Sequence, residues 1–123
     1  MTTEERAAQI WPVLALAARN RQILTYEMVG QMIGVPARGL GKLLEPIQSY
    51  CLVNKLSPLT ILVVRKRAGL PGSGFSAATA KEYGKCQMQV FEYDWLAHGA
   101  PTPGDLAQAV AVHPSRGKPS RAG

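Results

Sequence analysis

Cysteine and histidine are scarce in this chain, which has two of each among its 123 residues. Cys51 and Cys86 match neither a CxxC motif nor a zinc-ligand spacing. His98 and His113 both lie near the C-terminal end, and neither cysteine has a histidine beside it in the sequence. The sequence therefore gives no support to a metal centre, a bound cofactor or a cysteine–histidine nucleophile.

Acidic residues are also few. Eight Asp and Glu stand against 14 Lys and Arg, a formal net charge of +6. Only Glu92 and Asp94 are close together, and side chains two positions apart on a helix do not face each other, so an acid–base pair is poorly supported. The positive charge favours nucleic acid as the partner, ahead of an anionic membrane. The folded part is only mildly basic, because three cations lie in the C-terminal tail: Arg116, Lys118 and Arg121.

Long apolar runs are missing as well, since none approaches the roughly 20 residues that cross a bilayer. The first six residues are polar and acidic, where a signal peptide needs a basic start and an apolar core. We therefore expect a cytoplasmic protein with both thiols free. The length suits one domain. We place it at residues 1–112, followed by a disordered basic tail at 113–123, which has no core-forming residue.

The first helix is expected from Thr3 to Asn20, with Thr3 as its N-cap. Pro12 removes one helical hydrogen bond, so either the helix kinks there or the main helix starts near Trp11. Later helical segments are expected at 46–54, 77–96 and 101–112, and Glu45-Pro46 should interrupt the chain before the first of them.

The stretch TYEMVGQMIGVPARGLGKLL (residues 25–44) reads as two short helices joined by a tight turn. We expect the first helix at Tyr26–Ile33 and the second at Ala37–Leu44. Gly34 suits a left-handed cap, and Pro36 suits the start of the next helix. The inward residues of the first helix should be Val29, Met32 and Ile33. This pattern is typical of a helix-turn-helix.

In such motifs the early residues of the second helix reach base edges or phosphates. Here those positions hold the cations Arg38 and Lys42, together with Gly39 and Gly41. A glycine costs a helix up to about 1 kcal/mol relative to alanine, and close approach of another backbone is the usual compensation. The alternative is that the glycines let this helix pack tightly on its neighbours while both cations are merely solvated.

The run LTILVV (59–64) is apolar on both faces and predicts a strand covered on both sides. Arg65, Lys66 and Arg67 follow it, and then a loop rich in glycine at 69–75. Three cations between a strand and such a loop suit a wing that contacts phosphate, although an ordinary polar strand exit has the same composition. The expected fold is mostly α with a small β element, a winged helix-turn-helix-like single domain.

The chain also carries a series of short motifs in order: a tryptophan in the first helix, Thr25-Tyr26, Ala37-Arg38-x-x-Gly41, a strand reading ILVVRK before a Gly-rich turn, and a Lys81-containing helix that ends in WLAHG (95–99). From about Trp11 to Ala100, this order resembles the C-terminal domain of the alkylguanine-DNA alkyltransferases and their alkyltransferase-like relatives.

The resemblance implies a winged helix that binds the minor groove of DNA. It also implies that Tyr26 helps to rotate out a target nucleotide and that Arg38 takes its place in the stack. The family's reactive motif, Pro-Cys-His-Arg ahead of Val-Val, is absent, because the corresponding stretch (57–64) reads SPLTILVV. The resemblance thus extends to fold and binding mode and not to alkyl transfer.

The sequence therefore predicts a non-enzymatic protein of bacterial or phage type that binds double-stranded DNA and senses modified or distorted sites. The candidate contacts are Tyr26, Arg38, Gly39, Lys42, Arg65, Lys66 and Arg67. One alternative is a protein-interaction module of a phage-defence or counter-defence system, favoured by the mild charge and the partly aromatic C-terminal half. A less favoured one is an enzyme with Cys51 or Cys86 as its nucleophile.

Overall fold

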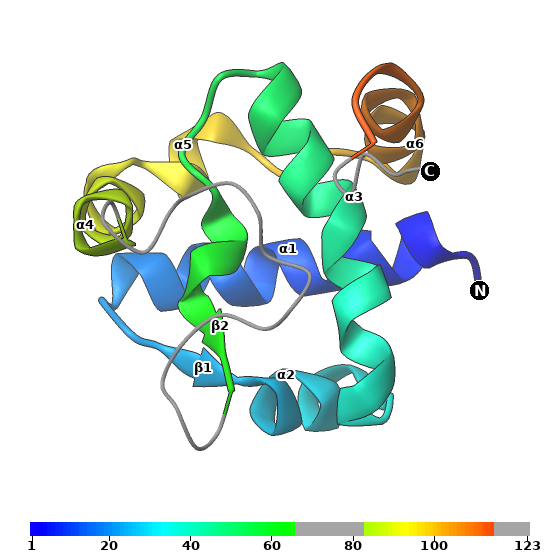
Figure 1. Ribbon diagram of the computed structural model, residues 1–123, viewed down its shortest axis with the longest axis horizontal. Coiled ribbons are helices and arrows are strands. Elements are labelled where there is room, and N and C mark those ends of the chain that lie inside the picture. Colours follow the sequence, from blue (N-terminus) through cyan, green and yellow to red (C-terminus); the bar gives the residue numbers. More distant parts are fainter. Residues whose placement is uncertain (66–82, 115–123) are drawn as a thin grey trace.

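The computed structural model describes residues 1–65 and 83–114, and this part is mostly helical with a small two-stranded parallel sheet (Figure 1). None of its helices is both long and apolar enough to cross a membrane. The elements, in chain order, are α1 (Thr3–Arg19), β1 (Leu24–Thr25), α2 (Tyr26–Ile33), the 3-10 turn η1 (Ala37–Gly39), α3 (Leu40–Val53), the 3-10 turn η2 (Leu59–Leu62), β2 (Val63–Val64), α4 (Tyr83–Glu92), α5 (Trp95–His98) and α6 (Pro103–Val112).

Helix α1 forms the centre of the core, and α3, α6, η2, α5, α2 and α4 all contact it (Figure 1). Its N-cap is Thr2 and not the expected Thr3, because Thr2 and Glu5 form a capping box in which each side chain accepts the other's backbone N–H, at 3.0 and 2.8 Å. The helix continues through Pro12 to Arg19. The alternative prediction, that the main helix starts only near Trp11, is therefore wrong.

The run 59–64 is buried throughout, as its composition predicts, but it is not one strand. Its first four residues form η2, and only Val63–Val64 extends as β2, in parallel with β1. The register pairs Leu24 with Val63 and Thr25 with Val64. Because β1 offers only two residues to pair with, the rest of the run satisfies its backbone in a 3-10 turn, while its apolar side chains enter the core.

Helix α2 has the predicted bounds. Thr25 caps it by accepting the backbone N–H of Met28 at 3.1 Å, and Gly34 ends it in the left-handed region at φ 78°. The expectation that Met32 faces inward is wrong, since 56% of its surface is exposed. The buried face of this short helix is centred on Val29 and Gly30, which turns Met32 outward.

The turn after α2 closes on Gly30, whose carbonyl accepts the N–H groups of Gly34 and Val35 at 2.8 and 2.9 Å. A Cβ at Gly30 would lie 2.5 Å from the Val35 carbonyl oxygen, so only glycine permits this approach. From α1, the Arg6 guanidinium donates to the Ile33 carbonyl at 2.8 Å. These contacts fix the angle at which the chain enters η1 and α3.

Helix α3 begins later and runs further than expected. Residues 37–39 form η1, and one helix then extends from Leu40 to Val53. The predicted interruption at Pro46 is wrong. Pro46 loses one backbone hydrogen bond, but it lies on the buried side of α3 with Leu44 and Ile47, and their burial offsets that cost.

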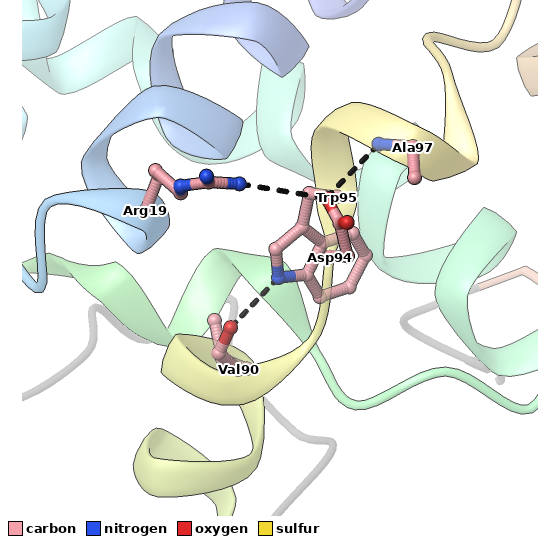
Figure 2. A network of polar contacts seen from close by, with 5 residues as sticks. All are labelled: Arg19, Val90, Asp94, Trp95 and Ala97. Atoms are coloured by element: carbon pink, nitrogen blue, oxygen red, sulfur yellow. Dashed lines mark hydrogen bonds and ion pairs between the residues drawn. The ribbon is translucent and has the colours of Figure 1, made fainter.

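The segment expected as one helix over 77–96 divides at a corner, and its residues 77–82 lie outside the described part. Figure 2 shows how the corner is held. Trp95 is buried and donates its indole N–H to the Val90 carbonyl at 2.8 Å. Asp94 caps α5 by accepting the N–H of Ala97 at 3.1 Å, and it lies 3.7 Å from Arg19. The pair with Arg19 is about three-fifths exposed, so it contributes little to stability.

Helix α6 begins two residues later than expected, at Pro103, after a capping box between Thr102 and Asp105. It packs on α3 and α1 through Leu106 and Ala109. His113 and Pro114 are exposed, and the rest of the expected tail, 115–123, lies outside the described residues.

The Gly30 contact can be tested by substitution. We expect Gly30→Ala to lower the free energy of unfolding by about 1–3 kcal/mol, because the new methyl group meets a backbone atom that cannot move aside. The matched control is Gly104→Ala in α6, whose Cβ would lie 3.7 Å from the Thr102 hydroxyl, an ordinary contact. Urea unfolding measures both, and equal midpoints for the two variants would contradict the packing described here.

A candidate nucleic-acid interface

The segment predicted to be a helix-turn-helix lies at one end of the molecule, where α2, η1, the start of α3 and the end of β2 come together (Figure 1). Arg38 on η1, Lys42 in the first turn of α3 and Arg65 after β2 are all exposed. Tyr26 begins α2 and is half-buried. The structure thus brings five of the seven predicted site residues to this end, Gly39 among them, while Lys66 and Arg67 lie outside the described residues.

The three cations carry no ion pair within the described residues, in contrast to Arg19, which pairs with Asp94. Two acidic residues also lie at this end, Glu27 in the first turn of α2 and Glu45 further along α3. Helices α1, α2 and α6 each have at least one acidic residue in the first turn, whereas α3, α4 and α5 have none there. Acidic side chains normally stabilise the positive end of a helix dipole. The start of α3 is therefore left positive and without a negative side chain of its own.

The two glycines at this end have different positions. Gly39 is the N-cap of α3, where glycine costs only a few tenths of a kcal/mol relative to the favoured caps. Gly41 lies inside the first turn of the helix. A Cβ built on either one meets no atom of the described residues within 4 Å, so tight packing against these residues does not account for the two glycines.

A narrow pocket lies behind Gly41. Its empty volume of about 250 Å3 includes the open mouth, and its enclosed part has room for about one water molecule. Residues of α2, α3, η2 and β2 line it: Tyr26, Gly41, Leu44, Glu45, Gln48, Thr60 and Val63. Among the described residues, the wall carries a carboxylate, an amide and a hydroxyl but no cation.

Thr60 is the unusual residue of this pocket. It is 4% exposed, and its Oγ1 atom has no hydrogen-bond partner among the described residues. Ser49 on α3 carries a second such hydroxyl, but it does not line the pocket. A buried hydroxyl without a partner costs roughly 1–3 kcal/mol. Sequence reasoning missed Thr60, although the one hydroxyl in the apolar run LTILVV was a visible signal.

Neither cysteine stands in a site that would activate it. Cys51 is 1% exposed, and burial raises the pKa of its thiol to about 12, although a hydrogen bond with the backbone of Leu59 acts in the opposite direction. The thiolate is the nucleophilic form, so this thiol is unreactive near neutral pH. Cys86 is half-buried on α4. No group of three His, Cys, Asp or Glu within the described ranges could hold a metal ion.

A second polar cluster lies at the far end of α3. His98 bonds the Tyr50 hydroxyl through Nε2 at 3.0 Å and the Tyr93 hydroxyl through Nδ1 at 2.9 Å. Edge-to-face contacts of Trp11 with Tyr50 and Trp95 continue the cluster, with ring centroids 5.3 and 5.6 Å apart. Desolvation, followed by the charge of Asp105, raises the pKa of Tyr50. Both ring nitrogens of His98 are occupied, so the cluster joins α1, α3 and α5 structurally.

Comparisons with protein-family models, curated proteins and solved structures found no match for this chain. The resemblance to the alkyltransferases therefore stays a prediction from the short motifs.

The difference between the two thiols gives a direct test of the cysteine nucleophile. At pH 8 we expect an aromatic disulfide reagent to modify Cys86 quickly in the folded protein, while Cys51 reacts only at the rate of unfolding. Cys86→Ser should abolish the fast phase, and Cys51→Ser should leave it unchanged. Fast modification of Cys51 in the folded Cys86→Ser variant would show that the Cys51 thiol is reactive, and Cys51 would again be a candidate nucleophile.

Proposed function

We propose that this protein is a non-enzymatic, winged-helix-like binder of double-stranded DNA. The observation that carries the proposal is the open, positive start of α3, where Gly41 stands between the exposed cations Arg38 and Lys42 with no described atom in the space beside it. A phosphate backbone can approach a helix closely where there is no side chain, and two cations and the helix dipole then favour its charge.

Arg65 extends this surface from the end of β2, which contacts α2. The wing in this proposal rests on the sequence Arg65-Lys66-Arg67, of which the structure describes only the first residue. In the complex, Arg38 and Lys42 contact the groove and the phosphates that border it, and the cations of the wing contact further phosphates. Contacts to phosphate do not depend on the base sequence of the DNA.

We also propose that the protein prefers modified or distorted DNA. Tyr26 lies on the wall of the pocket behind the cationic surface, so it is placed to contact a displaced nucleotide. The side chain of Arg38 is exposed and ends in a planar guanidinium, which can stack in the place of a base that has left the DNA helix. These two roles come from the resemblance to the alkyltransferase-like proteins, and the position of Tyr26 supports the first.

A protein-interaction module is the second candidate, and one feature favours it. A groove between α3 and α6 is lined by Tyr50, Val53, Asn54, Asp105, Gln108, Ala109 and Val112. Val53 and Val112 are 38% and 68% exposed. The groove lies at the end of α3 away from the cations, so a protein partner and DNA would occupy different surfaces. Retention of a co-purifying protein without retention on DNA at low salt would favour this candidate.

The double substitution Arg38→Ala with Lys42→Ala tests the DNA surface. We expect duplex affinity to fall at least about tenfold at low salt, because two charge-assisted contacts are lost. The slope of log affinity against log salt should become shallower by about 2, because each cation that neutralises a phosphate releases about one counterion from the DNA. Fluorescence anisotropy with a labelled duplex measures both quantities.

The matched control removes the same charge elsewhere. Lys55→Ala with Lys85→Ala alters two exposed cations outside the helix-turn-helix, one after α3 and one on α4. This control should keep most of the affinity and the salt slope. Equal losses in the two double variants would show that only net charge matters and would rule out a specific surface at α3.

A further inference from the structure

The groove between α3 and α6 offers groups that neither the core nor the proposed DNA surface uses (Figure 1). Its volume of about 650 Å3, which includes the open mouth, is within the range of clefts that hold a ligand or a partner's side chains. Tyr50, Val53 and Asn54 form the α3 side. The α6 side recurs at helical spacing over two turns: Asp105, Gln108, Ala109 and Val112. Two turns span about 10 Å, enough for one extended side chain and its neighbours.

The polar groups available in the groove are hydrogen-bond acceptors. Nδ2 of Asn54 donates to the Tyr50 carbonyl at 2.8 Å, so the amide oxygen is the available part of that side chain. Oδ2 of Asp105 accepts the Thr102 N–H at 2.9 Å, which leaves Oδ1 for a ligand. Desolvation, followed by the charge of Asp105, raises the pKa of Tyr50, so the field of the carboxylate acts across the groove. Among the described residues no cation lines the groove, and a positively charged donor therefore fits it best.

The groove also has an apolar rim. Val53 and Val112 are 38% and 68% exposed, and both line the same groove as Asp105. Lysine and arginine side chains combine a charged head with an aliphatic stem that packs on apolar surface. A phosphate or a carboxylate would instead meet the charge of Asp105, with no cation among the described lining residues to offset it. The chemistry of the groove therefore favours a cation on an aliphatic stem.

We propose that this groove binds a segment of a protein partner in which an arginine or lysine stands beside an apolar residue. The charged head donates to Asp105 and Asn54, while its stem and the apolar neighbour cover the two exposed valines. A protein segment is favoured over a free hydrophilic cation, because only the segment brings apolar surface for both valines.

The inference does not rest on DNA binding, and it gives a chemistry to the partner of the second candidate function. The groove lies at the end of α3 away from Arg38 and Lys42 (Figure 1). DNA and the partner can therefore be bound at the same time, which would make the protein a link between the two.

A display library of random peptides, selected on the full chain, supplies the probe. We expect the recovered peptides to share an arginine or lysine next to an aliphatic or aromatic residue. Fluorescence anisotropy with a labelled synthetic copy of one such peptide then measures the affinity. Replacing its cation by a neutral analogue, citrulline for arginine or acetyl-lysine for lysine, should weaken binding by about two- to fivefold, as loss of an exposed ion pair does.

Two pairs of variants locate the site. Asp105→Asn removes the charge, while the amide oxygen can still accept the Thr102 N–H, and it should weaken peptide binding by the same factor. Asp94→Asn is its control, because it removes an exposed carboxylate that caps α5 outside the groove. Val53→Arg places a cation in the groove and should weaken binding at least about tenfold, since like charges repel. Ile23→Arg, at a residue that is also 38% exposed but lies before β1, should bind as the wild type does.

The outcomes separate this inference from the proposed function. Recovery of no peptide, recovery of peptides without a cation, or equal affinities within either pair of variants would overturn the inference. Sedimentation of the wild type as a dimer that Val53→Arg dissociates would assign the groove to a second copy of the chain and would overturn it as well. Arg38→Ala with Lys42→Ala should bind the peptide as the wild type does. Intact peptide binding without any duplex binding would overturn only the proposed function.

Discussion

The approach of the Val35 carbonyl to Gly30 determines how α2 meets the rest of the helix-turn-helix. Because no side chain separates the two, the chain reverses within the few residues between Ile33 and η1. The Gly30 carbonyl and Arg6 hold the backbone on either side of this reversal. The direction of α3, the exposure of its first turn and the pocket between α2, α3 and η2 all follow from that close contact.

The charges of the fold are distributed in agreement with this geometry. Acidic residues at the starts of α1, α2 and α6 complement those helix dipoles, whereas the first turn of α3, like those of α4 and α5, has no acidic residue. The exposed cations Arg38 and Lys42 lie at that start of α3. Gly41 inside the helix and the buried, unpartnered Thr60 hydroxyl each cost the free protein stability.

Local signals predicted α2 well. Its N-cap and its left-handed glycine fix both ends, so the bounds Tyr26–Ile33 follow from the sequence alone. Where tertiary packing competes with local preference, prediction failed. The interruption expected at Pro46 and the strand expected over 59–64 both gave way to burial in the core. The pocket could not be predicted from the sequence for the same reason, because only the fold brings Thr60 and Tyr26 to the same wall.

If the DNA backbone approaches α3 beside Gly41, as proposed, then Gly41→Ala should weaken the binding of duplex DNA without destabilising the fold. The alanine meets no described atom and should raise the free energy of unfolding by about 0.4–1 kcal/mol. We expect the same variant to bind duplex DNA at low salt several-fold more weakly than the wild type, since the methyl group occupies the space of the approaching backbone. An affinity equal to that of the wild type, or no duplex binding by either protein, would contradict it.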